Sequence, residues 1–257
     1  MKFLVTIFFL FPSISFADQL GNYTNNLQFV FHANEGIGNV LYDYSPNKSS
    51  AIIQNSGHVW ETGKSGFQIN NNITSNISIS SSLVVKIHSN LAFTFFIRFK
   101  INTLVGASGN YNAIASAKTT VDNKWSFGYR PNGNVVVGYS VNCTASVFDE
   151  TDRDFFTAGQ YYDVFITYIN QYMAMYGRKP FDNNWNNREW RLLEDRAAAT
   201  MCNTNPKAFI IPAWDSSANN AADISMDEIA YWDVNLSTST MRSYAENLTN
   251  KSKSISE

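Results

Sequence analysis

Apolar and polar residues alternate along most of this chain, and this period of two constrains the fold more than any other feature. The clearest run is Phe93–Ile101, in which aromatic and β-branched residues recur at every second position. Such alternation is typical of a β-strand with one buried face. Similar runs predict strands at 27–31, 66–69, 77–80, 125–129, 135–139, 161–169, 172–176, 209–211 and 227–233.

Turn signals separate these strands at short intervals. Asn132-Gly133 is a favoured hairpin turn because both residues tolerate positive φ, and Asn170-Gln171 separates the next two strands. Many short strands without alternating helices predict an all-β fold, an antiparallel jelly-roll β-sandwich. The segment 187–201 has helix formers at a period near 3.6 and predicts one short helical insert. Ser237 is a suitable N-cap for a second short helix.

The composition fits one large core. Aromatic residues make up 15% and charged residues only 16% of the 257 residues. The net charge of −2, without a basic cluster, argues against nucleic acid as a partner. The sequence leaves the oligomeric state open.

The first residues have the organisation of a secretory signal peptide. Lys2 supplies a positive charge, Phe3–Phe11 is apolar, and Ser15-Phe16-Ala17 is a small-x-small cleavage site. The apolar run is too short to span about 30 Å of hydrocarbon, and no later segment predicts membrane insertion. We therefore expect a secreted, extracellular protein with a signal peptide over 1–17, one sandwich domain over 18–249 and a disordered polar tail over 250–257.

Secretion also bears on glycosylation and on the cysteines. Cys143 and Cys202 would meet an oxidising compartment, which favours a disulfide that stabilises by about 4 kcal/mol; two buried free thiols are the alternative. Asn-x-Ser/Thr sequons are acceptors for N-glycosylation where the source organism glycosylates secreted proteins. The candidates are Asn22, Asn47, Asn72, Asn76, Asn142, Asn235, Asn247 and Asn250.

Five segments carry a family resemblance in their order along the chain. They are Phe29–Gly38, Tyr42–Asn47, Trp60–Phe67, Phe93–Phe99 and Ile224–Met241. Together they resemble the laminin-G-like jelly roll of the concanavalin A-like lectin/glucanase superfamily, over about 27–247. The last segment is similar to the closing Ile-Asp-Glu-Val segment of that family and is the most specific. The second departs from the family, because Pro46-Asn47 stands where the family has glycines.

Members of this group often hold one calcium ion. The resemblance implies a structural calcium ion among Glu35, Asp43 and Asp227, from the opening loops and the closing strand. Ordinary turn and capping roles explain these residues as well.

The sequence contains no recognisable catalytic motif. Asp227-Glu228 is the most prominent carboxylate pair, but neighbours in an alternating strand point to opposite faces and cannot act together as acid and base. The Glu-x-Asp-x-x-Glu run of glycanases in this superfamily is absent. The acidic segment 149–154 is interpreted as a solvated loop, with a calcium-binding loop as the alternative.

The segment 177–206 has the composition of a carbohydrate platform. Aromatic residues there stand among amides and arginines, and the candidate ligand-binding residues are Phe181, Trp185, Arg188 and Trp190. In the alternative, the tryptophans pin a long loop onto the sandwich. The leading hypothesis is a secreted lectin-like or adhesion module whose partner is a glycan or an extracellular glycoprotein. A polysaccharide-degrading enzyme and a structural extracellular protein are the alternatives.

The predicted disulfide can be tested directly. Peptide mapping without reduction should yield one linked peptide that contains Cys143 and Cys202, and Cys143→Ser should lower the melting temperature. Recovery of both thiols in free form from oxidatively secreted protein would rule the bridge out.

Overall fold

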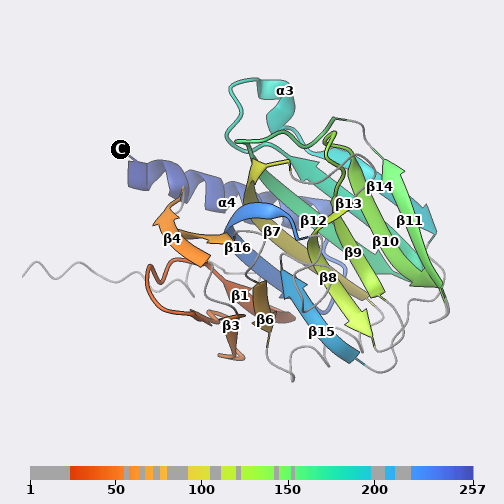
Figure 1. The fold of residues 1–257 in the computed structure, drawn as a ribbon, viewed down its shortest axis with the longest axis horizontal. Helices are drawn as coiled ribbons and strands as arrows, with labels where there is room; N and C mark the ends of the chain where they lie inside the picture. The colour runs from red at the N-terminus through yellow and green to blue at the C-terminus, as the bar shows by residue number, and fades with distance from the viewer. Residues whose placement is uncertain are drawn as a thin grey trace, which may run out of the picture.

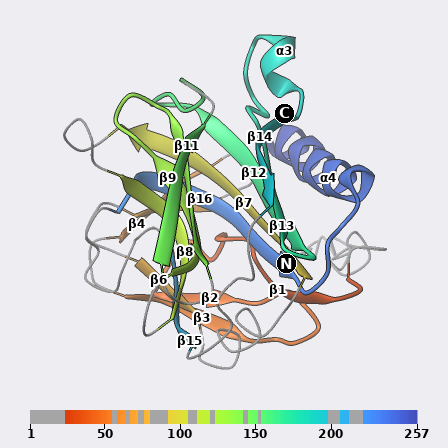
Figure 2. The same ribbon diagram turned by 90° about the vertical axis from the view of Figure 1, so that its right-hand side faces the viewer.

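The computed structural model describes residues 24–54, 58–63, 67–71, 76–79, 92–104, 111–119, 123–141, 145–151, 154–197, 206–211 and 221–256. Two antiparallel sheets pack face to face as a jelly-roll sandwich, and a long helix lies against one of them (Figures 1 and 2). The predicted all-β fold class is confirmed.

Sheet A contains β1 (Leu27–Phe31), β4 (His58–Thr62), β5 (Phe67–Asn71), β7 (Ala92–Thr103), β12 (Tyr161–Ile169), β13 (Tyr172–Arg178), β14 (Arg191–Ala197) and β16 (Asp223–Trp232). Its strand order is β14-β13-β12-β7-β16-β5-β4, and β1 pairs with β16 outside this path. The insert between β13 and β14 therefore lies at one edge of the sheet.

Sheet B contains β2 (Val40–Tyr42), β3 (Ser50–Gln54), β6 (Asn76–Ile79), β8 (Asn112–Thr119), β9 (Asn123–Tyr129), β10 (Val135–Val141), β11 (Ala145–Thr151) and β15 (Pro206–Ile211). Its order is β11-β10-β9-β8-β15-β6-β3-β2. Aromatic rings fill the space between the sheets: Trp125 of β9 lies 5.7 Å from Phe93 and 5.3 Å from Phe95 of β7.

Strand β7 is buried on both faces, which alternation alone did not predict. Phe93, Phe95 and Phe99 belong to the core between the sheets. Phe96 faces the opposite way and packs in a second apolar cluster with residues of the C-terminal helix. Sheet A is therefore the middle layer of three.

Helix α4 (Thr238–Ser256) is the third layer and crosses the outer face of sheet A (Figure 2). The predicted N-cap is confirmed, because Ser237 Oγ accepts a hydrogen bond of 3.2 Å from the Thr240 amide. The expected disordered tail over 250–257 is wrong for residues 250–256, which continue this helix. Packing of its apolar face against the sheet stabilises a helix that its polar composition alone would not. No helix in the described part of the chain is long and apolar enough to cross a membrane.

The predicted helix over 187–201 is also wrong for most of its length. In its described part, residues 187–197, the only helical structure is the end of one turn, α3 (Trp185–Arg188), and β14 follows it. Backbone pairing with β13 and burial of Leu193 in the core override the helix propensity of this segment.

Several other strands, among them β2, β3 and β4, were also not predicted. β8 was not predicted because its alanines and serines have weak strand propensity. Residues 149–151 of the expected solvated loop belong to β11, where Glu150 accepts a hydrogen bond of 3.1 Å from Arg130 Nε. The two predicted hairpins do form, with positive φ at Asn170, Gln171 and Gly133.

Candidate functional site

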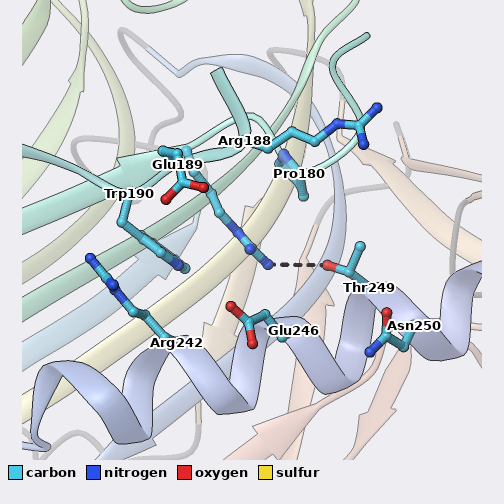
Figure 3. A pocket seen from close by; sticks show the side chains of 9 residues that line it. Pro180, Arg188, Glu189, Trp190, Arg242, Glu246, Thr249 and Asn250 are labelled. Carbon is cyan, nitrogen blue, oxygen red and sulfur yellow. Dashed lines mark hydrogen bonds between the residues drawn. The ribbon is translucent and has the colours of Figure 1, made fainter. Parts of the chain in front are cut away.

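A cleft of about 310 Å³ opens between the insert that joins β13 to β14 and the middle of helix α4, residues 242–250 (Figure 3). Its lining residues are Arg178, Pro180, Arg188, Glu189, Trp190, Arg242, Glu246, Thr249 and Asn250. This volume lies at the lower end of the range for small-molecule sites, so the cleft is large enough for a compact ligand.

Short-range hydrogen bonds hold the insert wall of the cleft. The Asp182 carboxylate accepts hydrogen bonds from the Asn184 amide at 2.8 Å and from Asn187 Nδ2 at 3.0 Å. These hydrogen bonds hold the pKa of Asp182 below its ordinary value, and the bond from the Asn184 amide has the largest effect. Arg188 Nε donates to the Asp182 carbonyl oxygen. The polar residues of the insert thus stabilise a fixed turn that positions Arg188 at the cleft.

Trp190 lines the cleft, and the hydrogen-bond donor of its ring is buried. Its half-buried ring packs 5.3 Å from the Phe165 ring, and the Arg178 guanidinium lies 4.8 Å from its centroid. Trp190 Nε1 is buried and has no hydrogen-bond partner among the described residues. A buried N–H without a partner costs about 1–3 kcal/mol, which a ligand oxygen would offset.

The cleft also contains charged groups that the described residues leave unpaired. Arg242 and Glu246 extend from α4, and Glu189 extends from the insert, as Figure 3 shows. None of these three makes a hydrogen bond or an ion pair within the described part of the chain. The cleft therefore offers cationic donors and anionic acceptors to one ligand.

The structure separates the four predicted ligand-binding residues. Arg188 and Trp190 line the cleft. Phe181 instead packs edge-on against Tyr161 and lies 5.4 Å from the Arg98 guanidinium, which is a structural role. Trp185 belongs to α3, and its side chain lies outside the described residues.

The sequence did not lead to the prediction that residues of α4 line a binding cleft. Arg242 and Glu246 are one helical turn apart, and that spacing on a predicted helix was the available signal.

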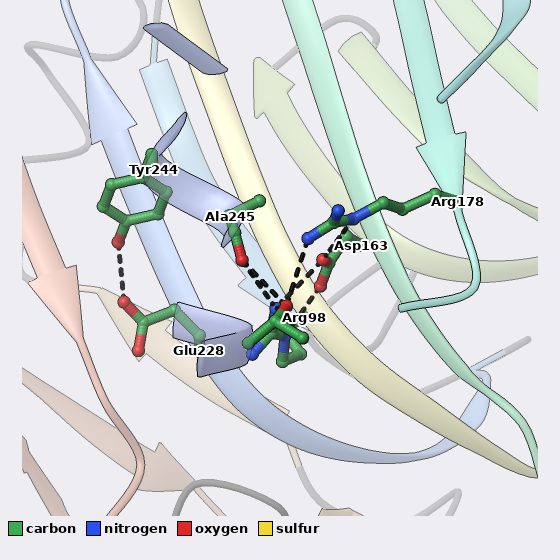
Figure 4. A network of polar contacts seen from close by, with 7 residues as sticks. Arg98, Asp163, Arg178, Glu228, Tyr244 and Ala245 are labelled. Atoms are coloured by element: carbon green, nitrogen blue, oxygen red, sulfur yellow. Dashed lines mark hydrogen bonds and ion pairs between the residues drawn. The ribbon is translucent and has the colours of Figure 1, made fainter. Parts of the chain in front are cut away.

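Beneath the cleft, two arginines share one buried carboxylate (Figure 4). Arg98 Nε and Nη2 donate to the two oxygens of Asp163 at 2.7 and 2.9 Å, and Arg178 Nε donates to Asp163 Oδ2 at 2.9 Å. Arg98 and Asp163 are completely buried. Burial by itself lowers the pKa of Arg98, but the Asp163 carboxylate raises it above its ordinary value.

The same arginines bind helix α4. Arg98 Nη2 donates to Thr249 Oγ1 at 2.9 Å and to the Ala245 carbonyl oxygen at 3.2 Å, and Arg178 Nη2 donates to Thr249 Oγ1 at 3.1 Å. The position of α4, and with it one wall of the cleft, depends on this network.

The carboxylate pair Asp227-Glu228 is a second buried polar group beneath α4. A bulge in β16 between Met226 and Glu228 leaves the two carboxylates together between the inward-facing Met226 and Ile229, so their predicted separation onto opposite faces is wrong. Glu228 Oε1 accepts a hydrogen bond of 2.6 Å from Tyr244 Oη, and Glu228 Oε2 lies 2.6 Å from His32 Nδ1. Both carboxylates are buried, and Tyr244 of α4 covers Glu228, so the pair is not open to a substrate.

The structure does not assemble the expected calcium site. The Asp43 carboxylate accepts hydrogen bonds from the amides of Val30, Ser45 and Ser49, and the Glu35 carboxylate accepts one from Tyr42. Among the described residues, no group of three His, Cys, Asp or Glu side chains could hold a metal ion. The turn-stabilising role that the sequence also allowed explains Glu35 and Asp43.

Several predicted modification sites lie outside the described residues. These are Cys143, Cys202, Asn22, Asn72 and Asn142, and the side chain of Asn76 is also not described. Asn47, Asn235, Asn247 and Asn250 have exposed side chains. Disulfide formation and glycosylation stay predictions.

Solved structures share this fold. The binding domain of Paraclostridial Mosquitocidal Protein 1 matches with a TM-score of 0.63 and 12% identity, over 86% of this chain and 52% of that chain. A Trypanosoma rangeli sialidase in complex with 2,3-difluoro-KDN matches with a TM-score of 0.61 and 13% identity, over 88% of this chain and 33% of that chain. The binding domain of botulinum neurotoxin DC, in complex with rat synaptotagmin II, matches with a TM-score of 0.56 and 12% identity, over 88% of this chain and 52% of that chain.

These likenesses establish the fold and not the function. The chain spans about half the length of the two toxin binding domains and a third of the sialidase chain. No protein-family model and no curated protein matches the sequence.

The shared carboxylate of Asp163 gives a stability prediction. Asp163→Ala leaves two buried arginines without their common partner and should lower the free energy of unfolding by about 3–5 kcal/mol, as measured by urea denaturation. Arg130→Ala is the control, because its pair with Glu150 has side chains 29% and 38% exposed and should contribute about 1 kcal/mol or less. Equal losses in the two variants would contradict the importance of the network.

Tyr244 gives a pH prediction. Burial and the Glu228 carboxylate raise the pKa of Tyr244 well above its ordinary value of 10.0. Above about pH 10, the unfolded chain loses this proton while the folded protein keeps it, so stability should fall as pH rises. Tyr244→Phe should reduce that slope in urea denaturation series between about pH 8 and about pH 11. An unchanged slope would show that Tyr244 ionises normally in the folded protein.

Proposed function

We propose that this chain is a secreted binding module that recognises a glycan, free or on a glycoprotein, in the cleft between the β13–β14 insert and α4. The resemblance of its sequence to laminin-G-like domains of the concanavalin A-like superfamily supports this proposal, because that group includes lectins. The single observation that carries this proposal is the set of charged side chains in the cleft, Glu189, Arg242 and Glu246, which have no partner among the described residues and can contact a ligand. The buried Nε1 of Trp190 also has no partner there.

The chemistry of the lining suits a polyhydroxylated ligand. A sugar hydroxyl both donates and accepts hydrogen bonds, whereas Arg242 only donates and Glu246 only accepts. Both are unpaired within the described part of the chain, so their contacts with a ligand do not break existing ones. Asn250 adds an amide that can do both.

The shared fold supports a role in binding. Two of the similar structures are, by their own descriptions, binding domains, and one of them was solved with rat synaptotagmin II. A secreted module with the same sandwich fits that role, although its ligand follows from its own cleft and not from theirs.

Glycan binding can be tested with a variant that leaves the fold intact. Arg242→Ala removes an exposed cation from the cleft and should weaken glycan binding about tenfold or more on a glycan array. Ser243→Ala, at the next and equally exposed position of α4, is the matched control and should bind as the wild type does.

Three outcomes would count against the proposal. If correctly folded protein bound no glycan on the array, a structural role would be favoured. Equal binding by both variants would place the site elsewhere. Release of reducing sugar that Glu246→Gln abolishes would make the cleft an active site, because its two carboxylates, Glu189 and Glu246, lie on opposite walls.

A further inference from the structure

A second hollow lies beside the N-terminal half of α4. Its volume is about 190 Å³, and strands β12 and β13 line it together with the start of the helix. Tyr172 and Ile169, at the tip of the β12–β13 hairpin, are 43% and 37% exposed there. The Asn235 amide also lines it. Neither Tyr172 nor Asn235 makes a side-chain hydrogen bond within the described residues.

The two hollows follow each other along the same two elements. On β13, Ala174 and Tyr176 line the second hollow, and Arg178, the next residue on that face, lines the cleft. On α4, Met241 lines the second hollow, and its neighbour Arg242 lines the cleft. No outward-facing position of β13 separates the two linings, and from this adjacency we infer that the hollows are the two ends of one groove.

The length of this groove follows from the geometry of its walls. From Thr238 to Asn250, α4 rises about 18 Å at 1.5 Å per residue. From Ala174 to Arg178, β13 extends about 14 Å at 3.4 Å per residue. Leu192, which pairs with Tyr176 across β13 and β14, is 51% exposed beside the middle of the groove. Apolar and hydrogen-bonding groups therefore line it from end to end.

We infer that the groove binds a linear saccharide of more than two sugar rings, with Trp190 and Arg242 at one end and Tyr172 at the other. This inference rests on the proposed glycan function and specifies the class of glycan. A linear saccharide presents apolar ring faces and hydroxyls at each repeat, which matches aromatic side chains interleaved with amide, hydroxyl and charged groups. An extended peptide is less suited, because the recurring modes of peptide binding use an open strand edge or an apolar groove, and charged groups of both signs fill the cleft end.

The test is an array of linear neutral, N-acetylated and carboxylated glycans from one to about eight rings, probed with wild type and variants. Wild-type affinity should rise with ring number within a series until the groove is filled. Tyr172→Ala should weaken binding of long glycans about fivefold and leave mono- and disaccharides unchanged, since one aromatic contact is worth about 0.5–1.5 kcal/mol. Arg242→Ala should weaken binding at every length.

Tyr42→Ala is the matched control, because this tyrosine of sheet B is 61% exposed and lies outside the groove. Affinity independent of length, with Tyr172→Ala indistinguishable from Tyr42→Ala, would overturn the groove and leave the proposed glycan function in place. The absence of binding to glycans of every length would overturn both the groove and the proposed glycan function. Undiminished capture of a glycoprotein after enzymatic removal of its glycans would identify a polypeptide ligand and also overturn both.

Discussion

The shared carboxylate of Asp163 fixes the outer layer of this protein. It accepts hydrogen bonds from arginines on both neighbouring strands, Arg98 of β7 and Arg178 of β13, and so neutralises charges that would otherwise be costly to bury. The oriented guanidinium groups then bind Thr249 of α4. Apolar packing alone would allow the helix to slide along the sheet, whereas these directional bonds set its position. The shape of the cleft is therefore a consequence of a buried charge that is in direct contact with one of its lining residues, Arg178.

The cleft joins two segments that are distant in sequence. The insert contributes Arg188, Glu189 and Trp190, and the helix contributes Arg242 and Glu246. The insert wall is held by its own turn, and the helix wall is held by the sheet below it. Because the two walls have separate supports, substitutions that leave both supports intact can change the lining without changing the sandwich.

Local chemistry explains what the sequence predicted well. The alternation in β7 and β12 identifies these strands because it follows the burial of their side chains. Ser237 identifies the start of a helix because an N-cap side chain bonds only to amides of the first helical turn. Features that depend on partners far along the chain were not predictable. β14 is a strand only because β13 lies beside it, the bulge in β16 reverses the direction of one carboxylate, and the helix wall exists only once α4 docks. The expected grouping of Glu35, Asp43 and Asp227 is likewise not found among the described residues, where backbone amides donate hydrogen bonds to the carboxylate of Asp43.

The hydroxyl group of Thr249 connects this architecture to the predicted N-glycosylation sites. Thr249 is the third residue of the Asn247 sequon, and Ser237, the N-cap of α4, is the third residue of the Asn235 sequon. A common way to abolish N-glycosylation replaces the hydroxyl residue, but here that change would also loosen the helix from its sheet or remove its cap. A loss of secretion in such a variant would then report misfolding and not the absence of an attached oligosaccharide. Asn→Gln changes at the exposed asparagines separate the two effects, because they leave both hydroxyl groups in place.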